Sequence, residues 1–261
     1  MTTKMFSLIA EIHNLPKICS IIRASKRSFR LLPGLYQEFA IQEQDSLNSQ
    51  RQVPEHVDLT VCSLWETDDQ EIKTIRNDLL RDMQIIPDFI TEVEEQALLS
   101  EVEPFMKKLR YEFDHWDDAI HGFKETERTV WKGVGGDALA RARQLAIPPP
   151  DVSLPHMHVL DLDAKGYIKP HVDSVRFCGN VVAGVCLLSP AVMRLRHSEK
   201  ADLFADFLLS RRCLYMMKGT SRYDFSHEVL KADLSYFKER QIVRTRRISI
   251  ISRSQPDPTK V

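Results

Sequence analysis

The strongest constraint on this chain is a histidine and an aspartate two residues apart, followed much later by a second histidine: His171, Asp173 and His227. Two imidazoles and one carboxylate can occupy three adjacent corners of a metal octahedron and leave three corners open. Structural zinc sites prefer four protein ligands, so this set points to catalytic non-haem Fe(II). Bringing such distant positions together requires a long loop closure, which is typical of a double-sheet barrel.

The spacing of the first two residues fits a strand. Residues two apart on a strand project to the same face, so His171 and Asp173 can grip one ion together. Residues 156–162 alternate in polarity, Gly166 predicts a turn, and residues 167–173 then predict the strand that carries the pair. We expect His227 to end another strand.

A pair of arginines follows the second histidine. Arg247 and Arg253 lie six positions apart in a strand-like segment, on one face and roughly 20 Å apart at Cα. Arginine binds carboxylates through two parallel hydrogen bonds, so the pair predicts an anchor for a dicarboxylate co-substrate. The preceding charged cluster, residues 244–247, predicts a solvated edge strand. His158 would approach the co-substrate if its side chain faced the barrel interior.

A lone H-x-D motif arises readily by chance. The alternative is therefore that His171 and Asp173 form a surface pair in a loop and that the arginines lie on a solvated edge. The distal histidine and the spaced arginines both favour the metal site, since each supplies a further part of the same chemistry.

In this order of motifs the chain resembles the AlkB-type Fe(II)/2-oxoglutarate dioxygenases, and the resemblance covers about residues 85–255. Longer blocks resemble a mitochondrial branch of that family: residues 111–123, 158–162, 166–174, 222–228 and 247–249. The resemblance implies an α+β, mainly β fold, with a double-stranded β-helix core (a jelly roll, cupin-like) braced by N-terminal helices.

The resemblance also assigns residues to cofactors. It implies Fe(II) ligation by His171, Asp173 and His227. It implies that Arg247 binds the distal carboxylate of 2-oxoglutarate and that Arg253 lies near its metal-chelating end. Tyr215 is the position expected to give a phenol hydrogen bond to this co-substrate.

The chain departs from the nucleic-acid repair members of the family. Their Asn-x-Tyr pair is replaced by Leu160 and Leu162, and the residues between the arginines are Ser249 and Ile251. The stretch 124–155 is too short for the long lid that flips a damaged base. The net charge of −1 gives no overall electrostatic attraction for nucleic acid. We therefore expect a protein or metabolite substrate, together with 2-oxoglutarate and O2.

Charge divides the chain into segments. Residues 1–37 hold six basic residues and one acid, with the amphipathic, serine- and arginine-containing composition of a mitochondrial transit peptide, although a basic arm is the alternative. Residues 38–85 are acidic and predict a linker with one weak helix, or an extension packed on the barrel. Residues 86–255 form the expected dioxygenase domain, and 256–261 a tail.

We expect the protein to be a monomer of the mitochondrial matrix, with helices beside the barrel and no membrane span. Thr91 and Glu94 predict a capping box that opens a helix to about Leu109, and a second helix is expected within 136–145. The five cysteines are scattered and predict reduced thiols. No apolar run reaches the ~18 residues that a bilayer span needs.

Three functions are compatible with these patterns. The first is a mitochondrial Fe(II)/2-oxoglutarate-dependent dioxygenase that hydroxylates a protein side chain or metabolite, in a branch linked to fatty-acid metabolism and programmed necrosis. The second is a mitochondrial RNA demethylase, which requires a basic, aromatic rim around the site. The third is a non-catalytic cupin-like scaffold that retains its metal ligands.

Overall fold

The computed structural model describes residues 53–113 and 118–256. They belong to one compact unit that begins at Val53. The predicted transit peptide (1–37) and all but the first residue of the tail (256–261) lie outside the described residues, as does Cys19. The four described cysteines are buried and free of disulfides, as predicted.

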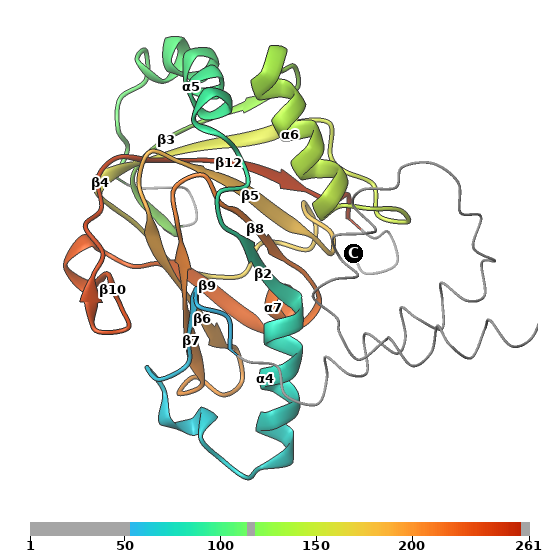
Figure 1. The fold of residues 1–261 in the computed structure, drawn as a ribbon, viewed down its shortest axis with the longest axis vertical. Coiled ribbons are helices and arrows are strands. Elements are labelled where there is room, and N and C mark those ends of the chain that lie inside the picture. Colours follow the sequence, from blue (N-terminus) through green and yellow to red (C-terminus); the bar gives the residue numbers. More distant parts are fainter. Residues whose placement is uncertain (1–52, 114–117, 257–261) are drawn as a thin grey trace, which may run out of the picture. The chain divides into compact units, whose positions relative to one another are not determined.

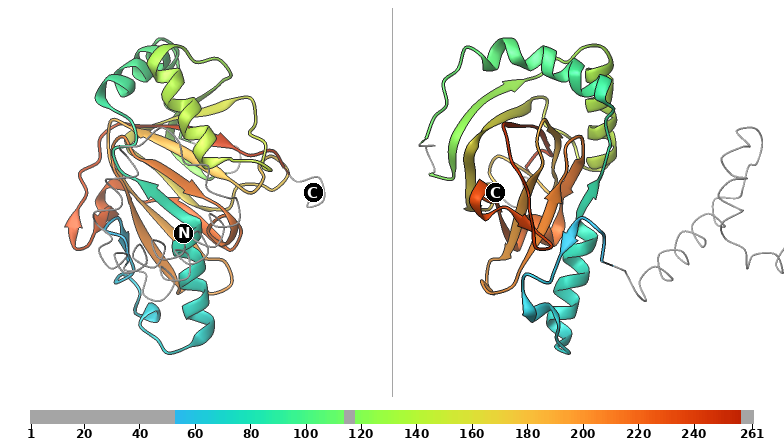
Figure 2. Two further views of the ribbon diagram at one scale, coloured as in Figure 1. Left: turned by 45° about the vertical axis from the view of Figure 1, so that its right-hand side comes forward. Right: turned by 60° about the vertical axis from the view of Figure 1, so that its left-hand side comes forward.

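The centre of this unit is a curled antiparallel sheet (Figures 1 and 2). Its path runs β1-β7-β6-β9-β4-β12-β5-β8-β2, with β3 paired to β4 off this path, and a separate ribbon joins β10 to β11. The predicted mainly β, jelly-roll class is confirmed. The strands are β1 (Val57–Asp58), β2 (Met83–Ile86), β3 (Ile120–Arg128), β4 (Met157–His171), β5 (Val182–Leu187), β6 (Ala191–His197), β7 (Phe204–Leu209), β8 (Leu214–Met217), β9 (Phe225–Val229), β10 (Tyr236–Phe237), β11 (Arg240–Gln241) and β12 (Arg247–Arg253).

Helices cover the outside of the sheet. The elements are α4 (Gln70–Asp82), α5 (Glu92–Met106), α6 (Gly133–Ala146), the short α7 (Gly219–Tyr223) and two 3-10 turns (Ser63–Trp65 and Ala232–Leu234). The predicted capping box is present, since Thr91 accepts from Glu94 N and the Glu94 carboxylate accepts from Thr91 N. None of the helices in the described ranges is long and apolar enough to cross a membrane.

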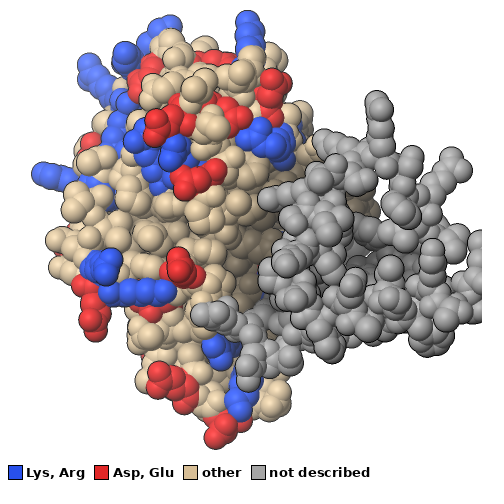
Figure 3. Space-filling model, viewed as in Figure 1, with Lys and Arg blue, Asp and Glu red and all other residues tan. Residues whose placement is uncertain are grey.

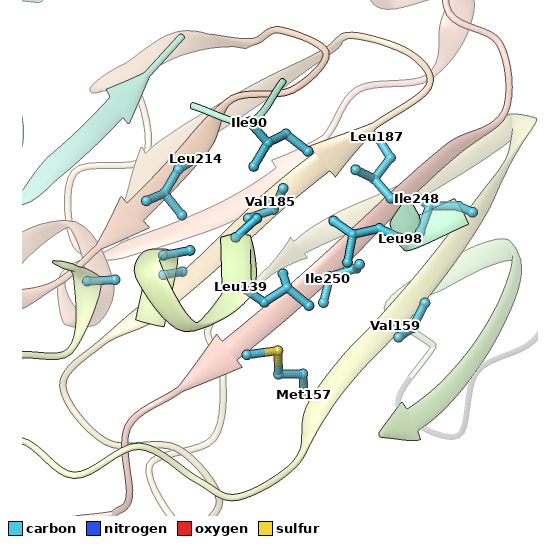
Figure 4. Packing of buried hydrophobic residues seen from close by; sticks show 14 of the residues in the cluster. Ile90, Leu98, Leu139, Met157, Val159, Val185, Leu187, Leu214, Ile248 and Ile250 are labelled. Carbon is cyan, nitrogen blue, oxygen red and sulfur yellow. The ribbon is translucent and has the colours of Figure 1, made fainter. Parts of the chain in front are cut away.

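The alternation of β12 divides its side chains between two environments. Ile248 and Ile250 face α5 and α6 and pack with Leu98 and Leu139, as Figure 4 shows. The odd-numbered residues of the strand, from Arg247 to Arg253, face the inside of the curl and line a pocket there. Because both faces of β12 are covered, all but its last residue are buried.

The prediction of a solvated edge strand at residues 244–247 is wrong. Strand β12 lies between β4 and β5, in the middle of the sheet. Arg244 is 6% exposed and donates to the backbone carbonyls of Leu230 and Ala164, which explains how a cluster of basic residues can be accommodated there. Its charge is therefore bound by backbone carbonyls of β4 and of Leu230, not by solvent.

The described part of the acidic segment 38–85 is built into the sheet. Strand β1 pairs with β7, and β2 pairs with β8, so the folded unit begins well before residue 86. Helix α4 carries the predicted apolar spacing and buries Leu79 in the core beside β7. Since the chain's apolar residues are sparse here, only contacts with distant strands show that it packs as an extension.

Gly166 does not form the predicted turn, because β4 runs through it without interruption. Opposite it, Gly122 has φ +69° at a bulge in β3, and a side chain at position 166 would meet the backbone carbonyls of Gly122 and His121. The glycine therefore permits a close approach of two strands rather than a change of direction. The long strand β4 carries both His158 and His171.

Replacing Gly166 by alanine should destabilise the protein by about 1–3 kcal/mol, since its methyl group would press on backbone. Lys165→Ala, at the exposed neighbouring position, should change stability by less than about 0.5 kcal/mol. Chemical denaturation of both variants measures the difference. Equal midpoints for the two would show that β3 and β4 can separate without cost.

Candidate metal and co-substrate site

An irregularity at the end of β4 aims His171 into the curl. Ile168 faces the pocket, so strict alternation would turn residue 171 away, but the pairing of β4 with β9 shifts between these two positions. After the shift His171 lies directly opposite His227, and their rings are 4.2 Å apart. Bulges beside functional sites commonly redirect a side chain in this way.

Asp173 joins the histidines from a loop. Strand β4 ends at His171, so the prediction that both residues lie on one strand is wrong. The Asp173 Oδ1 atom lies 3.4 Å from His171 Nε2 and 3.8 Å from His227 Nε2. Candidate ligand atoms of the three residues all lie within 4.8 Å of one another, which a single metal ion can span.

Hydrogen bonding sets the ring nitrogen that His171 presents. Its Nδ1 lies 2.9 Å from the backbone carbonyl of Lys169, which can only accept, so Nδ1 carries the proton. Nε2 is then the ring nitrogen that faces Asp173 and that can bind a metal ion. Metal-binding histidines are commonly oriented by such a bond from the other nitrogen.

Charge and burial shift the pKa values of the other two residues, Asp173 and His227. Burial acts to raise the pKa of Asp173, but its hydrogen bond with His171 and the charge of Arg253 outweigh this and hold the pKa well below its usual range. Burial lowers the pKa of His227 to about 3, with repulsion from His171 adding to it. At neutral pH one carboxylate and a lone-pair-bearing His227 therefore face the centre.

Arg247 is a buried cation whose side-chain partner among the described residues is a sulfur, not a carboxylate. It is 2% exposed, and its Nη2 donates to the thiol of Cys186 at 3.1 Å. Its Nε bonds to none of the described residues. A buried guanidinium in this condition is costly unless an anion completes it, so Arg247 fits the carboxylate of a ligand.

Tyr215 reaches the same pocket because of the residue paired with it. Gly184 lies opposite Tyr215 in the β5–β8 register, and a Cβ at position 184 would come within 2.6 Å of the phenol oxygen. The absence of a side chain leaves room for the ring. Burial raises the pKa of Tyr215, so the phenol stays a neutral hydrogen-bond donor.

Arg253 connects the pocket to the metal-site carboxylate. Its Nε donates to Asp173 Oδ2 at 2.9 Å, which leaves the other carboxylate oxygen beside the two histidines. This places Arg253 at the metal end of the pocket, and Arg247 and Tyr215 line it as well. All six residues expected to serve metal or co-substrate thus lie around one pocket.

The sequence reasoning missed Ser249, which it treated only as a departure from the repair enzymes. Ser249 is 1% exposed, lines the pocket between the two arginines, and its hydroxyl bonds to none of the described residues. The signal that could have found it is the same alternation that relates Arg247 to Arg253. His158 also lines the pocket.

The residues present fit a metal ion and a dicarboxylate. One ionised carboxylate and two histidines offer three protein ligands, a number that leaves coordination sites open for a bidentate co-substrate and oxygen. The incompletely bonded Arg247 and Ser249 supply donors at a distance from that centre. Cation-binding and anion-binding groups therefore share one pocket.

Residues 105–253 match the family model described as the 2OG-Fe(II) oxygenase superfamily. A Mus musculus protein named Alpha-ketoglutarate-dependent dioxygenase alkB homolog 7, mitochondrial, is 48% identical over 179 residues, 68% of this chain and 81% of that protein. The Bos taurus protein of the same name is 48% identical over the same shares. The predicted resemblance to the AlkB-type family, in a mitochondrial branch, is confirmed.

The solved structures that align with this chain are more distant in sequence. A Trichoplax adhaerens prolyl hydroxylase in complex with a hypoxia inducible factor peptide fragment aligns with 75% of this chain and 96% of its own, at 12% identity and a TM-score of 0.49.

Because His227 is buried in its neutral form, the stability of the metal-free protein should depend on pH. The unfolded chain binds a proton at this residue below the ordinary pKa of 6.5, whereas the folded chain resists it down to about 3, so stability is lost as pH falls from 6.5. Between pH 7 and pH 5 the loss relative to His227→Asn should reach about 1–2 kcal/mol. Denaturation of both proteins at the two pH values measures it, and parallel pH profiles would contradict the assignment.

Proposed function

Because the chain belongs to the 2OG-Fe(II) oxygenase superfamily, and is thus an Fe(II)- and 2-oxoglutarate-dependent dioxygenase, we propose which of its residues perform that chemistry. His171, Asp173 and His227 bind the iron. Arg247, Arg253 and Tyr215 bind 2-oxoglutarate. The observation that carries the proposal is the shared pocket, in which a cluster able to hold a metal lies beside a buried arginine that has no carboxylate partner among the described residues.

With iron and 2-oxoglutarate bound, this family couples oxidative decarboxylation of the co-substrate by O2 to hydroxylation of a substrate C–H bond. The chain's part is to orient the reactants and to exclude water. His171 presents Nε2 because Lys169 holds its other nitrogen, and Asp173 presents one oxygen because Arg253 holds the other.

The two arginines divide the co-substrate between them. Arg247 is at the other end of β12 from Arg253, lines the pocket together with Tyr215 and Ser249, and binds the distal carboxylate. The guanidinium of Arg253 is held beside Asp173 and therefore serves the metal-chelating end. This assignment places donors at both ends of a five-carbon dicarboxylate and fixes its direction.

The pocket walls favour an aliphatic C–H bond of a protein side chain or metabolite as the substrate. Seven of the lining residues are aliphatic or thioether side chains: Ile120, Leu160, Ile168, Val182, Met193, Val229 and Ile251. Nucleobase pockets instead stack the base between aromatic or apolar groups and read its polar edge with hydrogen bonds. The aliphatic walls of this pocket can accept a carbon-rich group, which has no polar edge that needs a hydrogen-bond partner.

The charges on the face seen in Figure 3 also favour a protein or metabolite substrate. Figure 3 shows acidic and basic side chains interspersed on the face seen, over α5 and α6 above all, with no continuous basic surface. The stretch 124–155, where repair enzymes carry a base-flipping lid, consists mainly of the remainder of β3 and of helix α6. These features support a protein or metabolite over RNA, the alternative substrate.

Further proposals rest on the family branch and on composition. The relatives are named mitochondrial, and we propose the matrix as the compartment, with residues 1–37 as the import signal. The branch's link with fatty-acid metabolism and programmed necrosis agrees with an apolar pocket. We also propose that residues 86–255 form the dioxygenase domain, with the preceding segment as its extension, in a monomer.

The proposed site is tested by succinate formation from 2-oxoglutarate with Fe(II), ascorbate and the full chain. Wild-type protein should form succinate slowly even without a substrate, and His171→Ala and Asp173→Ala should lower the rate at least about 100-fold while the fold remains intact. Succinate formation at the wild-type rate in either variant would overturn the ligand assignment. A wild-type protein that binds metal and 2-oxoglutarate tightly but never turns over would support the scaffold alternative.

Arg247→Met separates co-substrate binding from folding. The substitution removes the proposed carboxylate partner, so the Kd for 2-oxoglutarate should rise about 100-fold. The same change replaces a buried, incompletely hydrogen-bonded charge with an apolar side chain, so the melting temperature without ligand should stay equal or rise. Calorimetric titration and thermal melting give the two values. A lower melting temperature with unchanged affinity would assign Arg247 to the fold instead.

A further inference from the structure

His158 lies between two strands and reaches a side chain on each. It is on β4, with Glu127 directly opposite on β3 and Ile251 directly opposite on β12. Its ring does not bond to these direct partners but to the diagonal ones, Glu125 and Arg253. Diagonal neighbours on a sheet are within reach of long side chains.

The chemistry of these neighbours fixes the state of the ring. Arg253 Nη1, 3.4 Å from His158 Nδ1, can only donate, so Nδ1 must accept. Glu125 Oε2, 2.8 Å from Nε2, accepts, so Nε2 carries the proton. The ring is therefore the neutral Nε2–H tautomer, with its lone pair directed at the arginine.

Arg253 is consequently held at two points. Its Nε donates to Asp173 and its Nη1 to His158, and its Nη2 bonds to none of the described residues. One contact alone would let the guanidinium pivot about that contact. Two contacts fix its plane, and a planar donor binds a carboxylate well only when its plane is aligned.

We infer that His158 is a positioning residue for 2-oxoglutarate, which acts by orienting the guanidinium of Arg253, and that Glu125 holds the required tautomer of His158. This inference rests on the proposed role of Arg253 at the metal-chelating end of the co-substrate. It adds two residues, from β3 and β4, that do not themselves touch the ligand.

Two other roles for His158 make different predictions. If the ring contacted the co-substrate directly, its effect on binding would be independent of Arg253. If it served only the fold, its removal would lower stability without a selective loss of affinity. A double-mutant cycle with Arg253 separates these three roles, because only residues that act through one another are non-additive.

The test is calorimetric titration of 2-oxoglutarate into the Mn(II)-loaded full chain, which measures binding without turnover. His158→Leu should raise the Kd about tenfold. His158→Asn, whose amide oxygen can take the place of Nδ1 as acceptor, should stay within about threefold of wild type. Glu125→Gln should give a smaller increase than His158→Leu, since the acceptor remains and an amide, which can either accept or donate, holds its tautomer less strictly.

The chain offers a matched control two residues away. His156 and Glu127 form a similar pair, 3.6 Å apart, between the same two segments, but this pair is more exposed and does not reach Arg253. His156→Leu and Glu127→Gln should therefore leave the Kd within about twofold of wild type. The melting temperature and Mn(II) affinity of each variant show whether the fold and metal site are intact.

The double-mutant cycle of His158 and Arg253 distinguishes the positioning role from direct contact with the co-substrate. In an Arg253→Lys background, His158→Leu should change the Kd by less than about twofold. A tenfold effect that persists in this background would overturn the inference in favour of direct contact, and wild-type affinity of His158→Leu would overturn any role in binding. If Arg253→Lys itself leaves the affinity unchanged, the proposed function of Arg253 fails instead.

Discussion

Side chains of a β-strand alternate between the two faces of its sheet, and along β12 this alternation separates the core from the site. Ile248 and Ile250 are held under α5 and α6, which fixes the strand in register and depth. With these residues fixed, Arg247 and Arg253 must face the pocket on the opposite side. The burial of isoleucines thus determines where the arginines point, so the apolar core under the helices positions the polar site.

The pocket is organised by the pairing of charges that burial would otherwise make costly. Asp173 is balanced by Arg253, and this pairing leaves one carboxylate oxygen directed towards the two histidines. Arg247 contacts no carboxylate among the described residues, and its Nε has no partner there, so it can bind the carboxylate of a ligand. In the proposed assignment, Arg253 therefore completes the site before the co-substrate binds, whereas the co-substrate completes the bonding of Arg247.

Residue types and spacing predicted the site better than they predicted the backbone around it. The metal-binding cluster and the arginine pair could be proposed because their chemistry restricts the residue types that can serve. The role of Gly166 could not, since glycine predicts a turn and a close strand approach equally well, and only the contact with Gly122 decides between them. The burial of residue 244 could not be predicted for a related reason: the carbonyls that accept from Arg244 belong to β4 and to Leu230, and only the fold brings them together.

The most direct measurement is a crystal structure of the protein loaded without oxygen with Fe(II) and 2-oxoglutarate, with iron located by its anomalous scattering. We expect one iron atom bonded to His171, Asp173 and His227 and chelated by 2-oxoglutarate, whose far carboxylate pairs with Arg247. We also expect Arg253 to keep its contact with Asp173 at the near end. Iron bound elsewhere, or an Arg247 still directed at Cys186 with no carboxylate beside it, would contradict the proposed metal and co-substrate site.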